Sequence, residues 1–292
     1  MKNKSRIIFF IVGILLILSS ISKAEENDFI SINTTQEMQN LFQKSNYKNY
    51  ILEKDQTYPT ILIKNFPTDF GQTITKEEQQ KLFFMTLIPL IRKVNEEILN
   101  EKKIIYYLEH KLSENTLDST DEIIIEDLAV KYDISTKMQG YRRYAILLKQ
   151  LKLRANVIPP SLLLSMAAIN TNWGKGKFLA PSNNLYRELN WYTNEGLKPE
   201  DETEDTSYRI KIYPSLYASI KDYALKLNSN VDYTEFRNMR KVQEENNQQI
   251  SGRFLIPYLI FANDIPNYAG LLDYTITYHN LDTVDKIATK RP

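Results

Sequence analysis

Apolar side chains recur at helical spacing over a long stretch of the chain, from residue 75 to residue 112. Polar residues fill the positions between them, which is the pattern of an amphipathic helix. We therefore predict one long helix over 75–112. Pro89 is the position at which this helix would kink, because proline removes a helical hydrogen bond. The apolar positions are Leu82, Phe83, Leu87, Ile88, Ile91, Val94, Ile98, Leu99 and Ile105.

Shorter helical patterns flank this stretch. A short helix is expected around 38–42, and an extended segment follows at 58–66. Another helix is expected near 121–132. The pattern of a helix near 140–152 includes an apolar stripe of Tyr144, Leu147, Leu148 and Leu151. Further helices are predicted near 215–227, 233–248, 253–262 and 267–278.

The segment 161–171 is apolar on nearly every side, as is typical of a helix in the middle of a globular domain. It follows Pro159-Pro160, and proline is favoured in the first helical turn. The next segment, 183–206, is polar, aromatic and acidic, and 208–213 alternates as a strand does. We predict a buried central helix followed by a small β-hairpin, or flap.

The first 24 residues have the features of a secretory signal peptide. Three basic residues precede an almost unbroken apolar run of 12 residues at 7–18, and Ser22-Lys23-Ala24 offers the small residues of a cleavage site. The run is short for a membrane span. The alternative is an uncleaved N-terminal anchor, because residues 19–21 would lengthen the run. We expect export to the periplasm or cell envelope, with no stable membrane span after cleavage.

The composition narrows the chemistry that is available. The 292 residues are 42% hydrophobic and 25% charged, the balance of one or two globular domains. The absence of cysteine excludes disulfides, a thiol nucleophile and cysteine–zinc sites. His110 and His279 are too few for a three-histidine metal site. Chemistry must come mostly from carboxylates, hydroxyls, amides and the 19 tyrosines, and we expect no metal and no cofactor.

Signal cleavage would change the net charge of the chain. The segment 1–24 holds four basic residues and no acidic one, so 33 basic and 36 acidic residues remain and the charge falls from +1 to −3. Proteins that bind nucleic acid usually have a basic surface. We therefore expect no nucleic-acid partner.

Several motifs in order connect the central helix and the flap to a known family. Residues 157–168 read VIPPSLLLSMAA, 173–178 read WGKGKF and 183–186 read NNLY. The pattern continues with IYPS at 212–215 and NSNVDY at 228–233. Together they resemble the glucosaminidase domain of bacterial peptidoglycan hydrolases (mannosyl-glycoprotein endo-β-N-acetylglucosaminidase-like), and most closely the Bax-type branch, which is related to flagellar rod-cap hydrolases. The upstream segments that fit the same branch are 58–59, 66–69 and 81–99.

The resemblance implies a mainly α (α+β) fold, namely a lysozyme-like helical domain with a small β flap. Residues 140–280 would form this domain, and residues 25–135 would form a helical N-terminal extension packed against it. The implied partner is the glycan strand of peptidoglycan. The implied reaction is cleavage of the β-1,4 bond after N-acetylglucosamine, without metal or nucleotide. The oligomeric state is left open.

One position departs from the family in a way that bears on catalysis. The family pattern is Ala-Ala-x-Glu-Ser-x-Trp-Gly, with the glutamate as proton donor, and residues 167–174 read AAINTNWG, so the donor position holds Asn170. No Asp or Glu lies between residues 159 and 180. A carboxamide has no proton to give near neutral pH, and general acid catalysis contributes about 10²–10⁴-fold. We therefore expect hydrolysis to be lost or strongly impaired. Arg187 also stands where the family usually has glycine.

The flap and the neighbouring motifs supply the other site candidates. A flap carboxylate would have to take over the acid or base role, with Glu195 as the first choice and Glu188 as the second. Trp173 would stack on a sugar or close the junction between helix and flap. Asn183 and Asn184 would bind the N-acetyl group or cap a turn. The tyrosine candidates for substrate binding are Tyr186, Tyr213, which is alternatively a core residue, and Tyr233.

Three functional hypotheses stay open on the sequence. The first is a glucosaminidase-family protein that acts on or binds glycan strands, with hydrolysis doubtful because of Asn170. The second is a non-catalytic peptidoglycan-binding or scaffolding protein of the envelope. The third is an unrelated helical adaptor, which would have no affinity for peptidoglycan.

Overall fold

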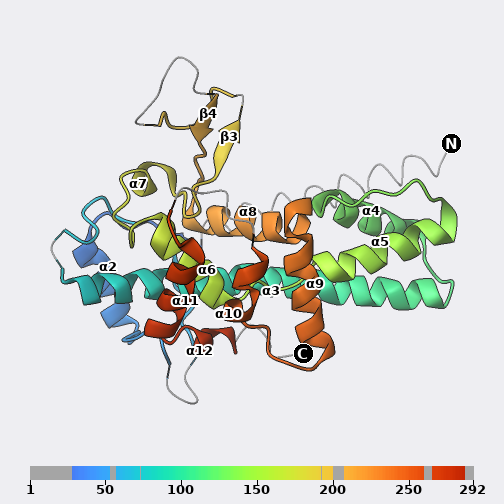
Figure 1. Ribbon diagram of the computed structural model, residues 1–292, viewed down its shortest axis with the longest axis horizontal. Coiled ribbons are helices and arrows are strands. Elements are labelled where there is room, and N and C mark those ends of the chain that lie inside the picture. The colour runs from blue at the N-terminus through green and yellow to red at the C-terminus, as the bar shows by residue number, and fades with distance from the viewer. Residues whose placement is uncertain are drawn as a thin grey trace.

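A computed structural model describes residues 28–52, 57–72, 74–191, 193–199, 207–259 and 265–286. The predicted signal peptide lies outside these residues, as does part of the acidic flap segment at 200–206. Within the described chain the structure is mainly helical with small two-stranded sheets, which confirms the predicted fold class (Figure 1).

The helices and strands follow the sequence patterns closely. The α-helices are α2 (Thr35–Lys44), α3 (Lys76–Ser113), α4 (Ser119–Lys131), α5 (Gly140–Arg154), α6 (Pro160–Asn170), α7 (Leu179–Ser182), α8 (Leu216–Ser229), α9 (Thr234–Glu245), α10 (Gly252–Leu255), α11 (Tyr268–Tyr278) and α12 (Asp282–Asp285). The short 3₁₀ helices are η1 (Val231–Tyr233) and η2 (Ile256–Tyr258). The strands are β1 (Phe29–Ile30), β2 (Leu62–Ile63), β3 (Leu189–Trp191) and β4 (Tyr208–Ile210).

Helix α3 is the long helix that the apolar spacing predicts, and it runs along the body of the molecule (Figure 1). Thr75 caps its N-terminus by accepting a hydrogen bond from the backbone N–H of Glu78, and two glutamates in the first turn favour the helix dipole. The helix continues through Pro89, which is buried. It packs against α5, α6 and α8, so it contacts both halves of the chain.

Helix α6 is buried along most of its length, as its uniform apolarity predicts. It begins with Pro160 and contacts α3, α10, α11 and α12. No side chain of its own segment caps its N-terminus. Instead, Asp285 of α12 accepts hydrogen bonds from the Ser161 backbone N–H (2.8 Å) and hydroxyl (2.7 Å). A carboxylate from the C-terminal end of the described chain therefore supplies the missing cap.

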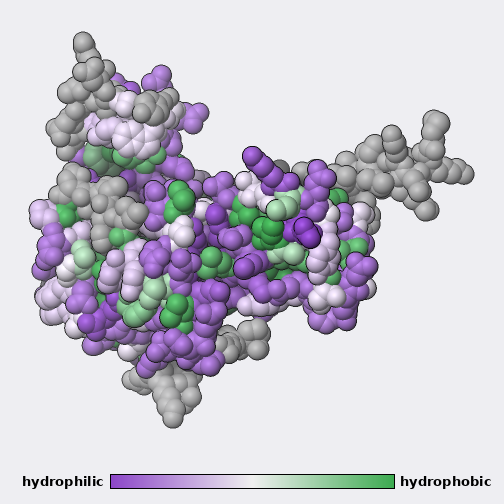
Figure 2. Space-filling model, turned by 45° about the vertical axis from the view of Figure 1, so that its right-hand side comes forward, coloured by the Kyte–Doolittle hydropathy of each residue, from purple (hydrophilic) through white to green (hydrophobic). Residues whose placement is uncertain are grey.

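Two hydrophobic cores lie side by side. The main core surrounds α6 and includes residues from Ile32 to Val284, so the N-terminal segments and the C-terminal helices bury their apolar faces in one cluster. The second core lies between α4, α5 and the C-terminal part of α3. We call these three segments the arm. Figure 2 shows a mostly hydrophilic face with scattered apolar patches. On α4 of the arm, Ile123 and Val130 are exposed.

The predicted flap is a short antiparallel hairpin of β3 and β4 that projects from the helical body (Figure 1). Leu189 pairs with Ile210, and Trp191 pairs with Tyr208. The second strand ends at Ile210 rather than continuing to Tyr213, because the Tyr213 N–H donates to the carbonyl of Ser182 next to α7. The chain therefore leaves the hairpin early and joins the flap to the body.

One predicted helix is shorter in the structure than its pattern suggests. The expected helix at 253–262 is divided into α10 and the 3₁₀ helix η2. Pro257 lies in η2, and its missing N–H cannot bond to the preceding turn. Among the described residues, no helix combines the length and apolarity needed to cross a membrane.

Candidate functional site

The site begins at the C-terminal end of the central helix. Asn170 is the last residue of α6 and is half-buried. The chain turns sharply after it, because Asn172, Trp173 and Gly174 all have φ in the left-handed region (+47°, +58° and +85°). Thr171 stabilises this turn by accepting a hydrogen bond from the Gly174 N–H (3.1 Å). The side chain of Asn170 is thereby held at the helix end rather than in the core.

Asn170 is oriented by a tyrosine from a distant helix. The Tyr268 hydroxyl on α11 donates to Asn170 Oδ1 at 3.2 Å. Burial raises the pKa of the Tyr268 hydroxyl well above its ordinary value, so this group stays a donor across the physiological range. With Oδ1 accepting from Tyr268, the two N–H groups of the carboxamide are left as donors.

Three further tyrosines lie in the same neighbourhood. The Tyr186 and Tyr223 rings stack at 4.2 Å with an interplanar angle of 9°. Burial raises the pKa of both hydroxyls far above the usual range, and the fields of Tyr233 and Tyr268 add to the shift at Tyr223. Burial also raises the pKa of Tyr233. These three tyrosines and Tyr268 are buried and keep neutral phenols, and Tyr268 is the member that contacts Asn170. We call Tyr186, Tyr223, Tyr233 and Tyr268 the tyrosine cluster.

Glu188 is a carboxylate that interacts electrostatically with this cluster. Its field raises the pKa values of Tyr223 and Tyr233. Its own side chain is 15% exposed, and both of its oxygens accept hydrogen bonds from Lys226 Nζ, at 2.7 and 2.9 Å. The Glu188 carboxylate is thus paired with Lys226 through both of its oxygens, at the base of the flap.

Asn184 connects the same part of the flap to the body. Its Nδ2 donates to the carbonyls of Glu188 (2.8 Å) and Lys211 (2.9 Å), and its Oδ1 accepts from the Glu188 N–H (3.0 Å). Asn183 adopts a left-handed φ of +52° and donates to the Tyr213 carbonyl at 3.1 Å. The turn-capping role considered for these two asparagines accounts for all of these contacts, whereas binding of an N-acetyl group stays a prediction.

Tyr213 and Trp173 are two further candidates, and both pack against the helical body. The Tyr213 hydroxyl donates to Asp222 Oδ2 of α8 at 2.6 Å, and its ring is buried. The half-buried Trp173 ring packs against Phe84 of α3 (5.3 Å) and His279 (5.0 Å). These contacts join the turn after α6 to α3. Sugar binding by Trp173 and Tyr213 stays a prediction.

The comparison with known proteins assigns this arrangement to a family. The family described as mannosyl-glycoprotein endo-beta-N-acetylglucosaminidase matches residues 139–281, which include α6, the flap and the tyrosine cluster. Residues 139–281 belong to the glucosaminidase family. "Protein bax" of Escherichia coli (strain K12) is 26% identical over 183 residues, which are 61% of this chain and 61% of that protein. The similarity thus spans about three fifths of this relative's length. No solved structure matches.

The family match confirms the resemblance drawn from the motifs, including its Bax-type branch. It also gives a structural meaning to one departure from the family pattern. Arg187, at the position where glycine is usual, has a φ of +56°, in the left-handed region that glycine adopts without strain. Arg187 therefore holds a backbone conformation that glycine would adopt without strain.

Glu195 lies apart from the other candidates. It is exposed in the flap turn, and its backbone is held by Thr193 Oγ1 and by the Asn190 side chain. The described contacts include none between Glu195 and either Asn170 or the tyrosine cluster. Within the described residues, no group of three histidine, aspartate or glutamate side chains could hold a metal ion.

The sequence analysis missed two residues of the candidate site. Tyr268 lies 98 positions beyond Asn170 in a segment predicted only as a helix, and Lys226 lies 38 positions beyond Glu188 on α8. Neither residue belongs to a motif used for the resemblance. Their roles depend on contacts over long sequence distances, for which the local pattern has no signal.

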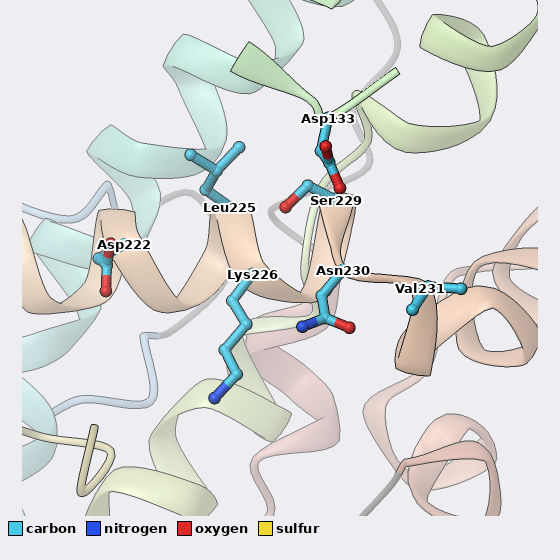
Figure 3. A pocket seen from close by; sticks show the side chains of 7 residues that line it. All are labelled: Asp133, Asp222, Leu225, Lys226, Ser229, Asn230 and Val231. Carbon is cyan, nitrogen blue, oxygen red and sulfur yellow. The ribbon is translucent and has the colours of Figure 1, made fainter. Parts of the chain in front are cut away.

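A pocket of about 370 Å³ adjoins the site along α8 (Figure 3). Lys226 lines this pocket and also bonds to Glu188, so the pocket and the site share a side chain. Asp222 lines it as well and bonds to Tyr213. The pocket residues are Asp133, Asp222, Leu225, Lys226, Ser229, Asn230 and Val231.

Proposed function

We propose that this glucosaminidase-family protein is exported to the cell envelope, where it binds glycan strands of peptidoglycan and hydrolyses them weakly or not at all. The observation that carries the proposal is Asn170 at the end of α6, with its Oδ1 engaged by the Tyr268 hydroxyl. This is the position from which the family's glutamate would donate a proton.

The chemistry of a carboxamide supports binding over hydrolysis. Cleavage of a glycosidic bond requires protonation of the leaving oxygen as the bond breaks. An amide N–H can donate a hydrogen bond to that oxygen but cannot transfer a proton to it near neutral pH. Loss of general acid catalysis costs about 10²–10⁴-fold in rate. Asn170 therefore keeps the recognition half of the role and loses the catalytic half.

Glu188 is a poor substitute for the missing acid. A general acid must carry a proton on one oxygen and direct it at the leaving group. Both oxygens of Glu188 instead accept hydrogen bonds from Lys226 Nζ. Glu195, the first choice from the sequence, is exposed in the flap, and we assign it no acid role.

The tyrosine cluster gives the proposed site an uncharged, fixed support, because its four rings are buried and Tyr268 holds Asn170. Uncharged hydroxyls and the carboxamide of Asn170 suit a neutral ligand with acetamido groups. Binding sites of this type commonly combine aromatic walls with a few fixed polar groups.

Export rests on the features of the first 24 residues and on the family. The basic start, the apolar run and the small residues before position 25 support a cleaved signal peptide. The uncleaved anchor remains the alternative and would keep the protein at the membrane surface. N-terminal sequencing of the protein recovered from cells distinguishes the two, because cleavage after Ala24 leaves Glu25 as the first residue.

The decisive experiment compares the mature protein with Asn170→Glu on isolated peptidoglycan sacculi. We expect the natural protein to sediment with sacculi and to release no reducing ends above a boiled control. Asn170→Glu should sediment equally and release reducing ends at least tenfold above that control, because it restores the acid. Asn170→Gln is the matched control, since it has the length of glutamate without the acid.

Two results would contradict the proposal. Hydrolysis by the natural protein would mean that another residue supplies the proton, and Glu188→Gln and Glu195→Gln would then identify it. Absence of any sedimentation with sacculi would exclude glycan binding and overturn the proposal.

A further inference from the structure

The pocket beside the site follows one face of α8. Asp222, Lys226 and Ser229 are spaced as residues on one side of a helix are. At 1.5 Å per residue, the stretch from Asp222 to Ser229 is about 10 Å long. An extended peptide advances about 3.3 Å per residue, so about three residues of a peptide fit along this face. The pocket therefore has the length for a short peptide.

The far wall of the pocket comes from the arm rather than from the family domain. Asp133 follows α4 and lines the pocket near Ser229 (Figure 3). The half-buried Arg154 fixes this wall, because its Nη1 donates to the carbonyls of Tyr132 (2.7 Å), Asp133 (3.0 Å) and Ser229 (2.6 Å). One guanidinium thus joins the turn after α4 to the end of α8, so the two walls are held together.

The charges in the pocket are unequally compensated. Lys226 is paired with Glu188, and Asp222 is paired with Lys211 Nζ at 2.9 Å. The Asp133 side chain is exposed and, among the described residues, has no ion pair. Leu225 and Val231 add apolar surface between the charged ends. The pocket therefore offers, at its arm end, one exposed carboxylate that lies in the field of Arg154 but has no direct ion pair among the described residues, and apolar contacts along its length.

This combination fits a peptide better than a sugar. A bare chain of N-acetylglucosamine carries no charge and no ammonium group, whereas the peptides attached to peptidoglycan strands carry amino groups and small aliphatic side chains. We propose that the pocket is a subsite for the stem peptide of peptidoglycan, with the Asp133 carboxylate accepting an ammonium group. This inference rests on the proposed function, and it deepens that function by naming a peptide-bearing glycan as the preferred ligand.

The test compares two probes of equal glycan length: an N-acetylglucosamine oligomer, and a peptidoglycan fragment that carries stem peptides. The mature protein should bind the peptide-bearing fragment more tightly. Asp133→Asn should weaken that binding about two- to fivefold, the range expected for an exposed ion pair, and leave binding of the bare oligomer unchanged. Asparagine tolerates the left-handed backbone of position 133 (φ +54°), so the fold should be kept, as an unchanged Tm would verify.

Asp127→Asn is the matched control, because it makes the same charge change on an exposed position of the same arm outside the pocket. The inference is overturned if Asp133→Asn binds both probes as the natural protein does, or if Asp127→Asn weakens the peptide-bearing probe equally. These results differ from a failure of the proposed function. In that case the natural protein would bind neither of the two probes and would not bind sacculi.

Discussion

At the scale of single residues, the contact between Tyr268 and Asn170 decides which groups the site presents. The hydroxyl donates to Oδ1, so the carboxamide N–H groups are turned away from α11. The raised pKa of Tyr268, caused by burial, keeps this arrangement the same over the physiological pH range. Recognition by Asn170 should therefore be nearly independent of pH, unlike recognition by a carboxyl group.

Tyr268→Phe tests this orientation. Removing the hydroxyl frees the Asn170 side chain to rotate, and we expect affinity for sacculi to fall about two- to tenfold, because one hydrogen bond contributes about 0.5–1.5 kcal/mol. Sedimentation with sacculi at several protein concentrations measures the change. Tyr274→Phe is the control, since this tyrosine is exposed on the same helix. Equal binding by both variants would show that Tyr268 does not orient Asn170 for ligand.

At the scale of elements, the short helix α12 stabilises the start of the central helix. Asp285 is buried and accepts hydrogen bonds from the Ser161 N–H, the Ser161 hydroxyl and the Gly252 N–H (3.0 Å). Burial raises the pKa of Asp285 to about 7, and the hydrogen bonds oppose this shift. The cap of α6 therefore titrates within the range in which the protein would function.

The raised pKa of Asp285 predicts how the stability of the fold depends on pH. Between about pH 4 and pH 7 the folded protein holds the Asp285 proton more tightly than the unfolded chain does. Its contribution to the free energy of unfolding is therefore largest at low pH and is lost as the pH rises through about 7. Thermal melts of the natural protein and Asp285→Asn at pH 5 and pH 8 measure it.

The comparison of these melts removes the contributions of other groups. Asp285→Asn should lose stability at both pH values, because its N–H₂ group cannot accept from Ser161 or Gly252. The loss should be greater at pH 5 than at pH 8, since the proton-linked part of the Asp285 contribution is present at pH 5 and is lost as the pH rises through about 7. A loss that is the same at both would show that Asp285 does not titrate in this range.

At the scale of the whole molecule, the extension and the glucosaminidase domain share one core. Helix α3 precedes the family match, yet Phe83, Phe84 and Leu87 are fully buried in the cluster that surrounds α6. Each such side chain contributes about 1.5–3 kcal/mol of burial. Several together reach the total stability of a typical protein, about 5–15 kcal/mol.

A chain that begins at residue 136 should consequently fail to fold. Without α3, the face of α6 that packs on it would be exposed, so we expect no cooperative thermal transition by circular dichroism. The matched comparison is the mature chain from residue 25, which should melt cooperatively. A truncated chain that melts cooperatively and still sediments with sacculi would instead show that the extension is a separable domain.

Local sequence pattern was sufficient to predict the longer helices and the hairpin of the flap, but not the short helices α7 and α12. The spacing of apolar residues predicts α3 within one residue at each end, and the uniform apolarity of α6 predicts its burial. The sequence also placed Asn170 at the helix end and a hairpin after it. These features depend on residues three or four positions apart, or on alternation along a strand, so the chain encodes them nearby.

Only the tertiary structure decided which distant residues meet. Tyr268 reaches Asn170 across 98 positions, Asp285 caps α6 across 124, and Arg154 joins the arm to α8 across 75. Burial of apolar surface is not directional. An apolar stripe therefore shows that one face of a helix is buried, but it does not show which partner buries that face. The sequence therefore determined the helices, the flap and the altered residue of the site, whereas the packing of those helices decided what surrounds that residue.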